Sequence, residues 1–468
     1  MRYNERMLAI PRAPLHLGLG LPLACALACG GDDGNASGAS GGSGASGASG
    51  ITGVTGVTGI TGGGSASESG GDDSDSGAPK LDLPADDTDG LPGGGDCGNQ
   101  LPKPGDKDFS IIWVANTAQG TVSKIDTATA TELARYRTGP GDPDPSRTTV
   151  NLRGDVAVAN RSGSVVKIAA RLESCVDSNQ NGIIDTSLGP SDVREWGDDE
   201  CVLWYHPLDF PQGLDSNQGG PRGIAWDGGQ SSNCYATANV WIGWRAQPST
   251  TAKIRRINGI TGQTDAEVEA PEWQCNWGHG PYGGAADKSG GYWGLGTLAN
   301  LVHVDAQSLQ VKRYQGPGGV VLYGIALDAE GTPWLGGWDG HLWRFDTVSE
   351  TFEDMGGVGA PQRLRGLAID KKGHAWIAGN DPCALAQYDT KSEALVNGDI
   401  ALPGCGEPVG VSIDRYGMVW VVDREANRAY RVDPATYEVV PVDGLVGPYT
   451  YSDMTGQGLS LVVDPPVG

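Results

Sequence analysis

The chain has 468 residues, enough for a large folded core, and carries a formal net charge of −24. An excess of carboxylates on this scale argues against nucleic acid as a partner and against a basic surface that binds membranes. The simplest explanation of the acidic charge is that it keeps the protein soluble in an extracellular setting.

The N-terminus has the pattern of an export signal. Residues 1–28 carry three arginines and then a glycine-interrupted apolar run, which is short for a membrane span. The run ends in Ala26-Leu27-Ala28-Cys29-Gly30, which resembles the lipobox of bacterial lipoproteins. That resemblance implies a signal peptide of residues 1–28, a lipidated Cys29 and, because Gly30 follows, sorting to the outer membrane. Ordinary secretion with cleavage near Ala28 is the alternative.

Residues 29–107 do not have the pattern of a folded core. Glycine recurs at every third position from 38 to 62, and acidic residues are concentrated between 67 and 96. The triplets lack the proline that stiffens a collagen triple helix, so we predict a Gly/Ser/Thr-rich and then acidic disordered tether. Such a tether would hold the following domain away from a surface.

A repeated frame organises residues 108–468. In the stretch 323–349 it consists of Gly-Ile-Ala-x-Asp, a glycine-containing turn, a Trp six residues after the Asp, and a short strand ending in Asp-x-x-Ser. The regular copies recur every 41 to 44 residues, and this period, with about three or four short strands in each unit, is typical of propeller blades. The frame predicts an all-β, seven-bladed β-propeller, with six or eight blades as alternatives. The repeated aspartates are Asp227, Asp287, Asp328, Asp370 and Asp414, and the repeated tryptophans are Trp241, Trp293, Trp334, Trp376 and Trp420.

The first and second units depart from this frame. The first begins at the Trp strand, and an extra segment, 449–463, follows the seventh. We predict that this C-terminal segment supplies the missing inner strand of the first blade, since closing the ring removes exposed sheet edges. The second unit lacks the Trp and is followed by an insertion at about 169–215. Almost no helix is expected after the signal peptide, and the tryptophans are expected to pack between blades.

The cysteines predict disulfides, because an exported acidic protein favours them over metal thiolates. Their order suggests three pairs and leaves Cys97 in the tether. The candidate pairs are Cys175 with Cys201, Cys234 with Cys275, and Cys383 with Cys405.

The insertion contains a stretch that matches the first part of an EF-hand-type calcium loop. Oxygen ligands occupy positions one, three and five, glycine allows the turn at six, a backbone carbonyl follows at seven and Asp stands at nine. The predicted ligands are Asp177, Asn179, Asn181, Ile183 and Asp185. Position twelve is Leu188, so the last carboxylate must come from elsewhere. The candidates for it are Asp192, Asp198, Asp199 and Glu200. A structural calcium ion is therefore predicted, with a metal-free Asx turn as the alternative.

A second constellation consists of the residues just before the glycine of each inner strand, together with Tyr449 in the C-terminal segment that closes the ring. Because inner strands run in one direction around a propeller axis, these side chains should meet at one mouth of the channel. The predicted ligand-binding residues are Arg222, Tyr282, Tyr323, Arg365 and Tyr449, with Val409 as the apolar member. Forked guanidinium donors and phenols suit a carboxylate, phosphate or sugar-like ligand. The alternative is that they cap the channel and bond to backbone carbonyls.

His279 lies three residues before Tyr282 and could approach the same mouth. It is the only catalytic candidate, since the common hydrolase, metalloprotease, phosphate-loop and dinucleotide motifs do not occur. The repeats PRGIAWD, PYGGAAD, LYGIALD, LRGLAID and PVGVSID resemble virginiamycin B lyase-like and NHL-type propeller repeats. The resemblance implies the fold and, as one activity, the metal-assisted opening of a cyclic ester. The lyase repeats carry Glu shortly after the Trp, and none of the matching stretches here does.

Two functions therefore follow from the sequence. The first is a lipid-anchored, monomeric propeller in the bacterial cell envelope that binds a small molecule, glycan or protein at its mouth. The second is a lyase or lactonase that uses magnesium.

Overall fold

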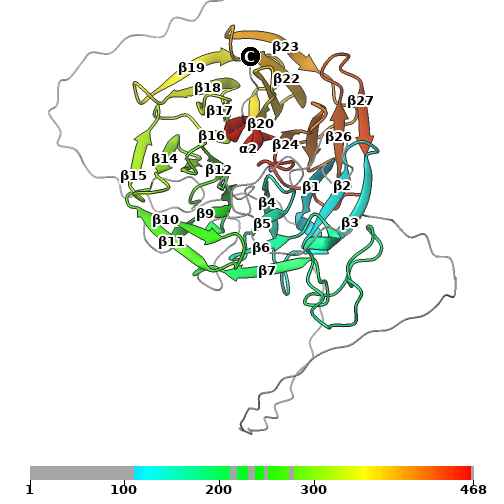
Figure 1. Cartoon of the computed structure of the whole chain (residues 1–468). Helices are drawn as coiled ribbons and strands as arrows, with labels where there is room; N and C mark the ends of the chain where they lie inside the picture. Colours follow the sequence, from blue (N-terminus) through cyan, green and yellow to red (C-terminus); the bar gives the residue numbers. More distant parts are fainter. Residues whose placement is uncertain (1–109, 211–218, 230–237, 247–250, 274–278, 465–468) are drawn as a thin grey trace, which may run out of the picture. The chain divides into compact units, whose positions relative to one another are not determined.

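The structure, a computed structural model, describes residues 110–210, 219–229, 238–246, 251–273 and 279–464. Within these ranges the chain forms seven antiparallel sheets around a common centre, as Figure 1 shows. The predicted all-β, seven-bladed propeller is therefore confirmed. The predicted signal peptide, the tether, Cys29, Cys97 and the pair Cys234 and Cys275 lie outside the described residues.

Each blade is laid down from the centre outward, so that consecutive strands are neighbours in the sheet. The first blade has three strands, and the other six have four each in the described residues. The first four blades are β1 (Ile111–Asn116), β2 (Thr121–Asp126) and β3 (Thr131–Arg137); β4 (Pro145–Val150), β5 (Val156–Asn160), β6 (Ser164–Ile168) and β7 (Val202–Pro207); β8 (Gly223–Trp226), β9 (Asn239–Ala246), β10 (Thr251–Asn258) and β11 (Thr264–Ala270); and β12 (Gly283–Ala286), β13 (Tyr292–Gly296), β14 (Asn300–Val304) and β15 (Val311–Gln315). The last three are β16 (Leu322–Leu327), β17 (Pro333–Gly337), β18 (His341–Asp346) and β19 (Thr351–Gly357); β20 (Arg363–Ile369), β21 (His374–Asn380), β22 (Ala384–Asp389) and β23 (Ala394–Ile400); and β24 (Pro408–Ile413), β25 (Val419–Asp423), β26 (Arg428–Val432) and β27 (Val439–Val442). Two 3-10 turns, η3 (Thr117–Gln119) and η4 (Leu172–Ser174), lie in the first blade and at the start of the insertion.

The C-terminal segment closes the ring along the inner edge of β1. The amide of Trp113 donates to the carbonyl of Met454 at 2.9 Å, and the amide of Tyr449 donates to the carbonyl of Ala115 at 3.1 Å. On the other side, the Thr455 hydroxyl donates to the carbonyl of Ile413 in β24 at 2.5 Å. The segment thus takes the place predicted for the missing inner strand, although it forms an isolated bridge rather than a regular strand.

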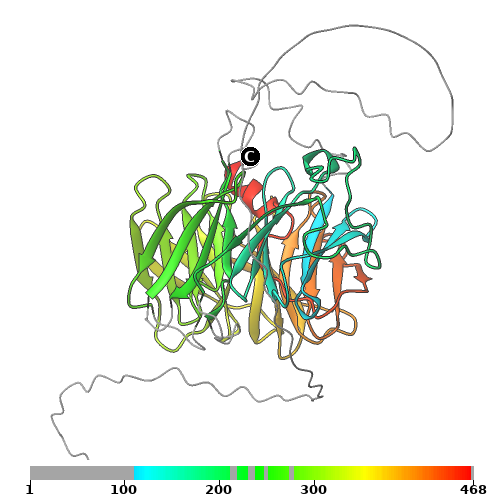
Figure 2. The ribbon, with the colours of Figure 1, turned by 90° about the horizontal axis from the view of Figure 1, so that it is seen from below.

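The end of this segment is helical, which corrects the prediction of a strand up to residue 463. Helix α2 (Gln457–Val463) begins after Gly456, whose φ of +78° turns the chain. The carboxylate of Asp453 accepts hydrogen bonds from the amides of Gly456 at 2.8 Å and Leu459 at 2.9 Å, which favours a helical start over continued pairing. Helix α2 lies over one end of the channel (Figures 1 and 2). Its Leu459 packs with Trp226, while Leu461 and Val462 join the cores of other blades.

The repeated tryptophans pack between blades, as predicted. Trp334 belongs to a core cluster with residues of β20 and β21, and Trp376 to one with residues of β24 and β25. The structure adds the reason for the fixed spacing to the Asp. In three blades the indole nitrogen donates to the carboxylate six residues earlier, at 2.9 to 3.0 Å. These pairs are Asp328 with Trp334, Asp370 with Trp376, and Asp414 with Trp420.

The predicted strand-ending turns and two of the predicted disulfides are confirmed. The carboxylate of Asp433 accepts from the amides of Ala435 at 2.7 Å and Thr436 at 3.1 Å, and the other turns repeat this pattern. The bridges Cys175–Cys201 and Cys383–Cys405 are formed. They indicate an extracytoplasmic protein. Among the described residues no helix is long and apolar enough to cross a membrane.

The insertion is narrower than predicted, because its last part is a strand of the second blade. Strand β7 pairs with β6, with His206 opposite Val165 and Trp204 opposite Lys167. The stretch between Ala169 and Cys201 projects from the blade and is closed at its base by the disulfide.

Candidate functional site

Four of the predicted mouth residues, Arg222, Tyr282, Tyr323 and Arg365, are each followed by a glycine, and Tyr449 is followed by Thr450. A Cβ atom placed on Gly283 would lie 2.8 Å from Ile325 Cγ2, and one on Gly366 would lie 2.7 Å from the Val409 carbonyl oxygen. Neighbouring inner strands thus approach too closely for a side chain there. The residue before each glycine lies at the start of its strand, at the end of the channel away from α2.

Three of the predicted tyrosines form one hydrogen-bonded group. The Tyr449 hydroxyl lies 2.9 Å from that of Tyr282 and 2.5 Å from that of Tyr323, and the Tyr282 hydroxyl donates to Tyr323 at 3.2 Å. Tyr451, which sequence reasoning missed, joins the group with its hydroxyl 3.4 Å from that of Tyr449. We call Tyr282, Tyr323, Tyr449 and Tyr451 the tyrosine cluster.

Arg147 is the second residue that the sequence did not reveal. It comes from β4, is fully buried, and places its guanidinium carbon 3.0 Å from the ring centre of Tyr451 and 4.8 Å from that of Tyr282. The repeated frame did not identify Arg147, because the frame requires a glycine after the mouth residue and Arg147 is followed by Thr148. Asn151 could have served as the signal, since its side-chain oxygen accepts from the amides of Arg153 at 2.9 Å and Asp155 at 3.0 Å, as the repeated aspartates do.

The two predicted arginines differ in their surroundings. Arg222 is buried, donates to the carbonyl of Gly220 at 2.9 Å, and lies 5.4 Å from the ring centre of Tyr282. Arg365 is paired with the buried carboxylate of Glu407 at 2.6 Å and donates to the side chain of Asn380 at 3.1 Å. Arg365 therefore holds adjacent blades together, and Glu407 also pairs with Arg424.

A hollow of about 390 Å³ opens above the tyrosine cluster. Among the described residues, its wall contains three guanidinium groups, two phenols, one imidazole and no carboxylate. The lining residues are Thr117, Ala118, Arg161, Arg222, His279, Tyr282, Arg424, Gly447 and Tyr449. His279 thus reaches the mouth, as expected, with its ring centre 4.9 Å from that of Tyr282.

The burial of the cluster shifts its pKa values. Burial lowers the pKa of Arg147 to about 10 and raises the pKa of Tyr282 to about 12. Burial alone would also raise the pKa of Tyr449, but the charge of Arg147 and the hydrogen bonds from Tyr282 and Tyr323 outweigh it, so that this pKa is lowered. The charge of Arg147 thus acts on the pKa values of Tyr282, Tyr323 and Tyr449 together.

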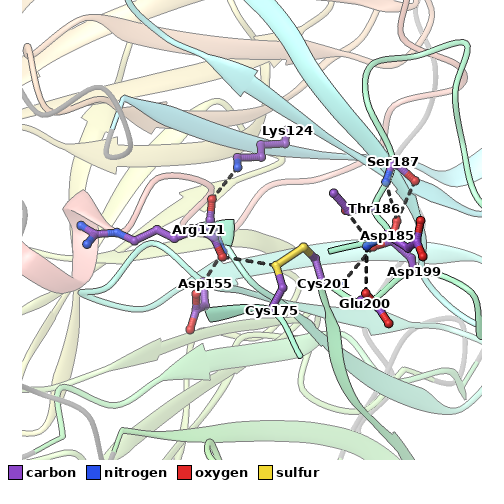
Figure 3. Close-up of a disulfide and its surroundings, with 11 residues drawn as sticks. Lys124, Asp155, Arg171, Cys175, Asp185, Thr186, Ser187, Asp199, Glu200 and Cys201 are labelled. Atoms are coloured by element: carbon purple, nitrogen blue, oxygen red, sulfur yellow. Dashed lines mark hydrogen bonds between the residues drawn. A yellow bond between two sulfur atoms is a disulfide. The ribbon is translucent and has the colours of Figure 1, made fainter. Parts of the chain in front are cut away.

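The predicted calcium loop lies in the insertion and is held by buried carboxylates beside the Cys175–Cys201 bridge (Figure 3). Glu200 accepts from the amides of Asp185 and Ser178, both at 2.8 Å, and these bonds lower its pKa. The Asp177 carboxylate accepts from the amide of Gly182 at 2.9 Å, and both loop asparagines donate to Asp185. The loop polar groups therefore satisfy one another as an Asx turn does.

Calcium binding to this loop stays a prediction. Adding calcium to the full chain should raise the melting temperature, because an ion between Asp177 and Asp185 would offset the repulsion of their carboxylates. The double variant Asp177→Ala, Asp185→Ala should lose this response, while magnesium should have a smaller effect on either protein. Differential scanning calorimetry in calcium and in chelator tests this, and an unchanged wild-type melting temperature would contradict it.

No group of three or more His, Cys, Asp or Glu side chains in the described part of the chain is arranged to hold a metal ion. Binding of magnesium stays a prediction that belongs to the lyase hypothesis.

Comparisons with known proteins give neighbours in fold only. No protein-family model matches the chain, and no curated protein sequence matches it. Virginiamycin B lyase from Staphylococcus aureus is 14% identical, with 68% of this chain and 91% of that chain covered and a TM-score of 0.48. A streptogramin B lyase structure is 13% identical, with 67% and 89% covered and a TM-score of 0.47. A Bacteroides caccae protein of unknown function is 12% identical, with 62% and 93% covered and a TM-score of 0.41.

Proposed function

We propose that this chain is an exported propeller that binds a small anionic ligand, or the anionic part of a glycan or protein, in the hollow at its mouth. The observation that carries the proposal is the composition of the wall. Arg161, Arg222 and Arg424 line the hollow, and the described side chains that line it include no carboxylate, in a protein with a net charge of −24. Guanidinium forks and phenol donors favour carboxylate or phosphate groups.

The charges near the hollow support a positive local field. Five arginines line the hollow or pack on the tyrosine rings beneath it, and within the described ranges Asp144 pairs with Arg161 while Glu407 pairs with Arg365 and Arg424. The arginines are Arg147, Arg161, Arg222, Arg365 and Arg424. Such a field attracts anions and is weakened by salt.

The rest of the proposal concerns where the domain is displayed. A lipid on Cys29 and a tether of residues 29–107 would place the propeller in the bacterial envelope, outside the cytoplasm, as a monomer. The extracytoplasmic disulfides support export, and Ala26 to Gly30 support the lipid.

Calorimetric titration of the full chain with glucuronate, acetate, inorganic phosphate and uncharged glucose tests the binding function. Anions should bind more weakly as salt is added, and glucose should not bind. Arg222→Ala should lower affinity by about tenfold or more, since it removes a charged hydrogen-bond donor. Arg344→Ala is the matched control, because Arg344 pairs with Glu353 on the outer strand β19 and with Glu393 in the turn before β23. An equal loss of anion affinity in the Arg222 and Arg344 variants would contradict the proposal, and so would binding of glucose.

A second candidate function, the opening of a cyclic ester, is favoured by one observation. His279 stands in the wall of the hollow, and histidine is the commonest side chain in proton transfer. Incubation with magnesium, a streptogramin-type depsipeptide and a panel of lactones, followed by mass spectrometry, separates the two functions. Fragmentation patterns that change with time, and stop changing in His279→Ala, would establish turnover; ligands recovered unchanged would establish binding alone.

A further inference from the structure

Arg147 is a buried charge without a matching acceptor. Its side chain has no exposed area, and only Nη1 has a hydrogen bond, to the carbonyl of Ser146 at 3.0 Å. Nε and Nη2 have no hydrogen-bond partner within the described ranges. Leaving charged donors unpaired away from water is costly, so a protein keeps such a group only when something else occupies those donors.

The neighbours of Arg147 do not supply the missing negative charge. No carboxylate within the described ranges is in ion-pair contact with it, and its guanidinium group packs instead on the rings of Tyr451, Tyr282 and Tyr449. Ring faces attract a cation but do not accept hydrogen bonds from the edge of a guanidinium plane. Arg222 approaches the ring of Tyr282 as well, so a second positive charge adds to the first.

Among the described residues, the hydroxyl groups of the tyrosine cluster lack an anionic acceptor, just as the guanidinium group of Arg147 does. Its hydroxyl groups bond to one another, and no other acceptor is bonded to them within the described ranges. An oxyanion placed among them would accept hydrogen bonds from the phenols and from the free edge of Arg147 together. Two guanidinium groups and several O–H donors match a group with two negative charges and several oxygen atoms.

We propose that Arg147, Arg222 and the tyrosine cluster form an inner seat for a dianionic oxyanion of the phosphate class, which enters from the hollow past Tyr449. The inner seat deepens the proposed function, on which it rests, because it specifies the head group of the ligand. It takes either free phosphate or the phosphate of a phosphorylated sugar.

Tyr449 is placed to open the seat. Its ring lies 5.6 Å from the guanidinium carbon of Arg147 on one side and lines the hollow on the other. The residue belongs to the ring-closing segment, which is held to β1 by an isolated bridge at Asn116 and Pro448 and by the backbone hydrogen bond from Tyr449 to Ala115. A side-chain rotation of Tyr449 therefore connects the hollow to Arg147 without breaking a regular strand.

The test compares inorganic phosphate, glucose 6-phosphate and acetate by calorimetry and by the melting temperature of the full chain. Both phosphates should bind at least about tenfold more tightly than acetate and raise the melting temperature more. Preference for glucose 6-phosphate identifies a phosphorylated ligand, and equal affinity identifies the free ion. Arg147→Met should abolish the preference for phosphate, and Arg147→Lys should lose most of it, because a point charge lacks the fork. Arg344→Ala should leave it unchanged.

Three results would overturn the inner seat. One is a wild-type protein that binds acetate and phosphate equally, which leaves the anion-binding function standing. Another is an unaltered phosphate preference in both Arg147 variants. The third is a phenolate absorbance band at neutral pH that disappears in Tyr449→Phe, since an ionised Tyr449 would already compensate Arg147. Failure of every anion to bind would instead remove the proposed function itself.

Discussion

Replacing Trp420 by alanine is expected to lower the free energy of unfolding by about 3–5 kcal/mol, the usual cost of removing a buried aromatic side chain. Trp420 has no exposed area and packs with Ile112, Val114 and Ile125 of the first blade. It therefore lies on the seam where the seventh blade meets the first. Its loss leaves a cavity in the contact that closes the ring.

Replacing Trp420 by alanine also removes one of the hydrogen bonds to the buried carboxylate of Asp414. The indole of Trp420 donates to Asp414 at 3.0 Å, and the amides of Tyr416 and Met418 supply the other bonds. Trp420→Phe keeps most of the apolar contact and loses only this donor, so it should cost less, about 1–3 kcal/mol. Chemical denaturation measures both variants. Val348→Ala is the control, because Val348 is 91% exposed and its truncation should have almost no effect.

The pH dependence of the phenylalanine variant gives a second readout. Burial raises the pKa of Asp414 in the folded protein above its unfolded value. The folded state therefore binds the proton more tightly, and stability decreases as the pH rises from the unfolded pKa to the folded pKa. Loss of the indole donor should extend this decrease to higher pH. An alanine variant as stable as the wild type would show that the seam does not depend on this tryptophan.

Most of the fold could be read from the sequence because one structural unit repeats. In units five to seven the Asp in the turn accepts a hydrogen bond from the Trp six residues later, so a change in the spacing of the pair would lose that bond. Unit four keeps the same spacing between Asp287 and Trp293. The second blade lacks this pair of Asp and Trp. Its outer strand β7 lies beyond the insertion, and Asn151 replaces the aspartate.

Helix α2 could not be predicted from the repeat, because it occurs once. The pattern that produces it is local: Asp453 caps the amides of the following turn, and Gly456 takes a positive φ. A seven-residue segment with four apolar side chains is as compatible with a strand as with a short helix.

The sequence predicted several of the residues at the mouth, but it did not predict Arg147 and Tyr451, which lie beneath the hollow. The glycine frame located Arg222, Tyr282 and Tyr323, since the glycine is required where inner strands touch. Arg147 lies at the equivalent position in a strand that has room for Thr148, whose hydroxyl lies 3.1 Å from that of Thr450. What each arginine can bind depends on its partners in neighbouring blades, and a single sequence does not specify those.

Arg365 is the position where the sequence and the structure lead to different experiments. The glycine frame predicts that it binds the ligand, whereas its contacts with Glu407 and Asn380 are those of a side chain that joins two blades. Arg365→Met should lower the free energy of unfolding by about 3–5 kcal/mol, because it leaves the buried carboxylate of Glu407 without its inner partner. Its remaining partner, Arg424, is half exposed and provides weaker compensation.

The double variant Arg365→Met, Glu407→Leu separates the two roles. Replacing both members of a buried ion pair by apolar side chains of similar size is often neutral, so the double variant should regain most of the stability that the single variant loses. If Arg365 only joins the blades, the double variant should also bind glucuronate within about threefold of the wild type, since Arg161, Arg222 and Arg424 still line the hollow. Denaturation and calorimetry on the same preparations measure both quantities. Recovered stability together with lost affinity would instead make Arg365 a direct ligand of the anion, reached by exchange of Glu407 for the bound group.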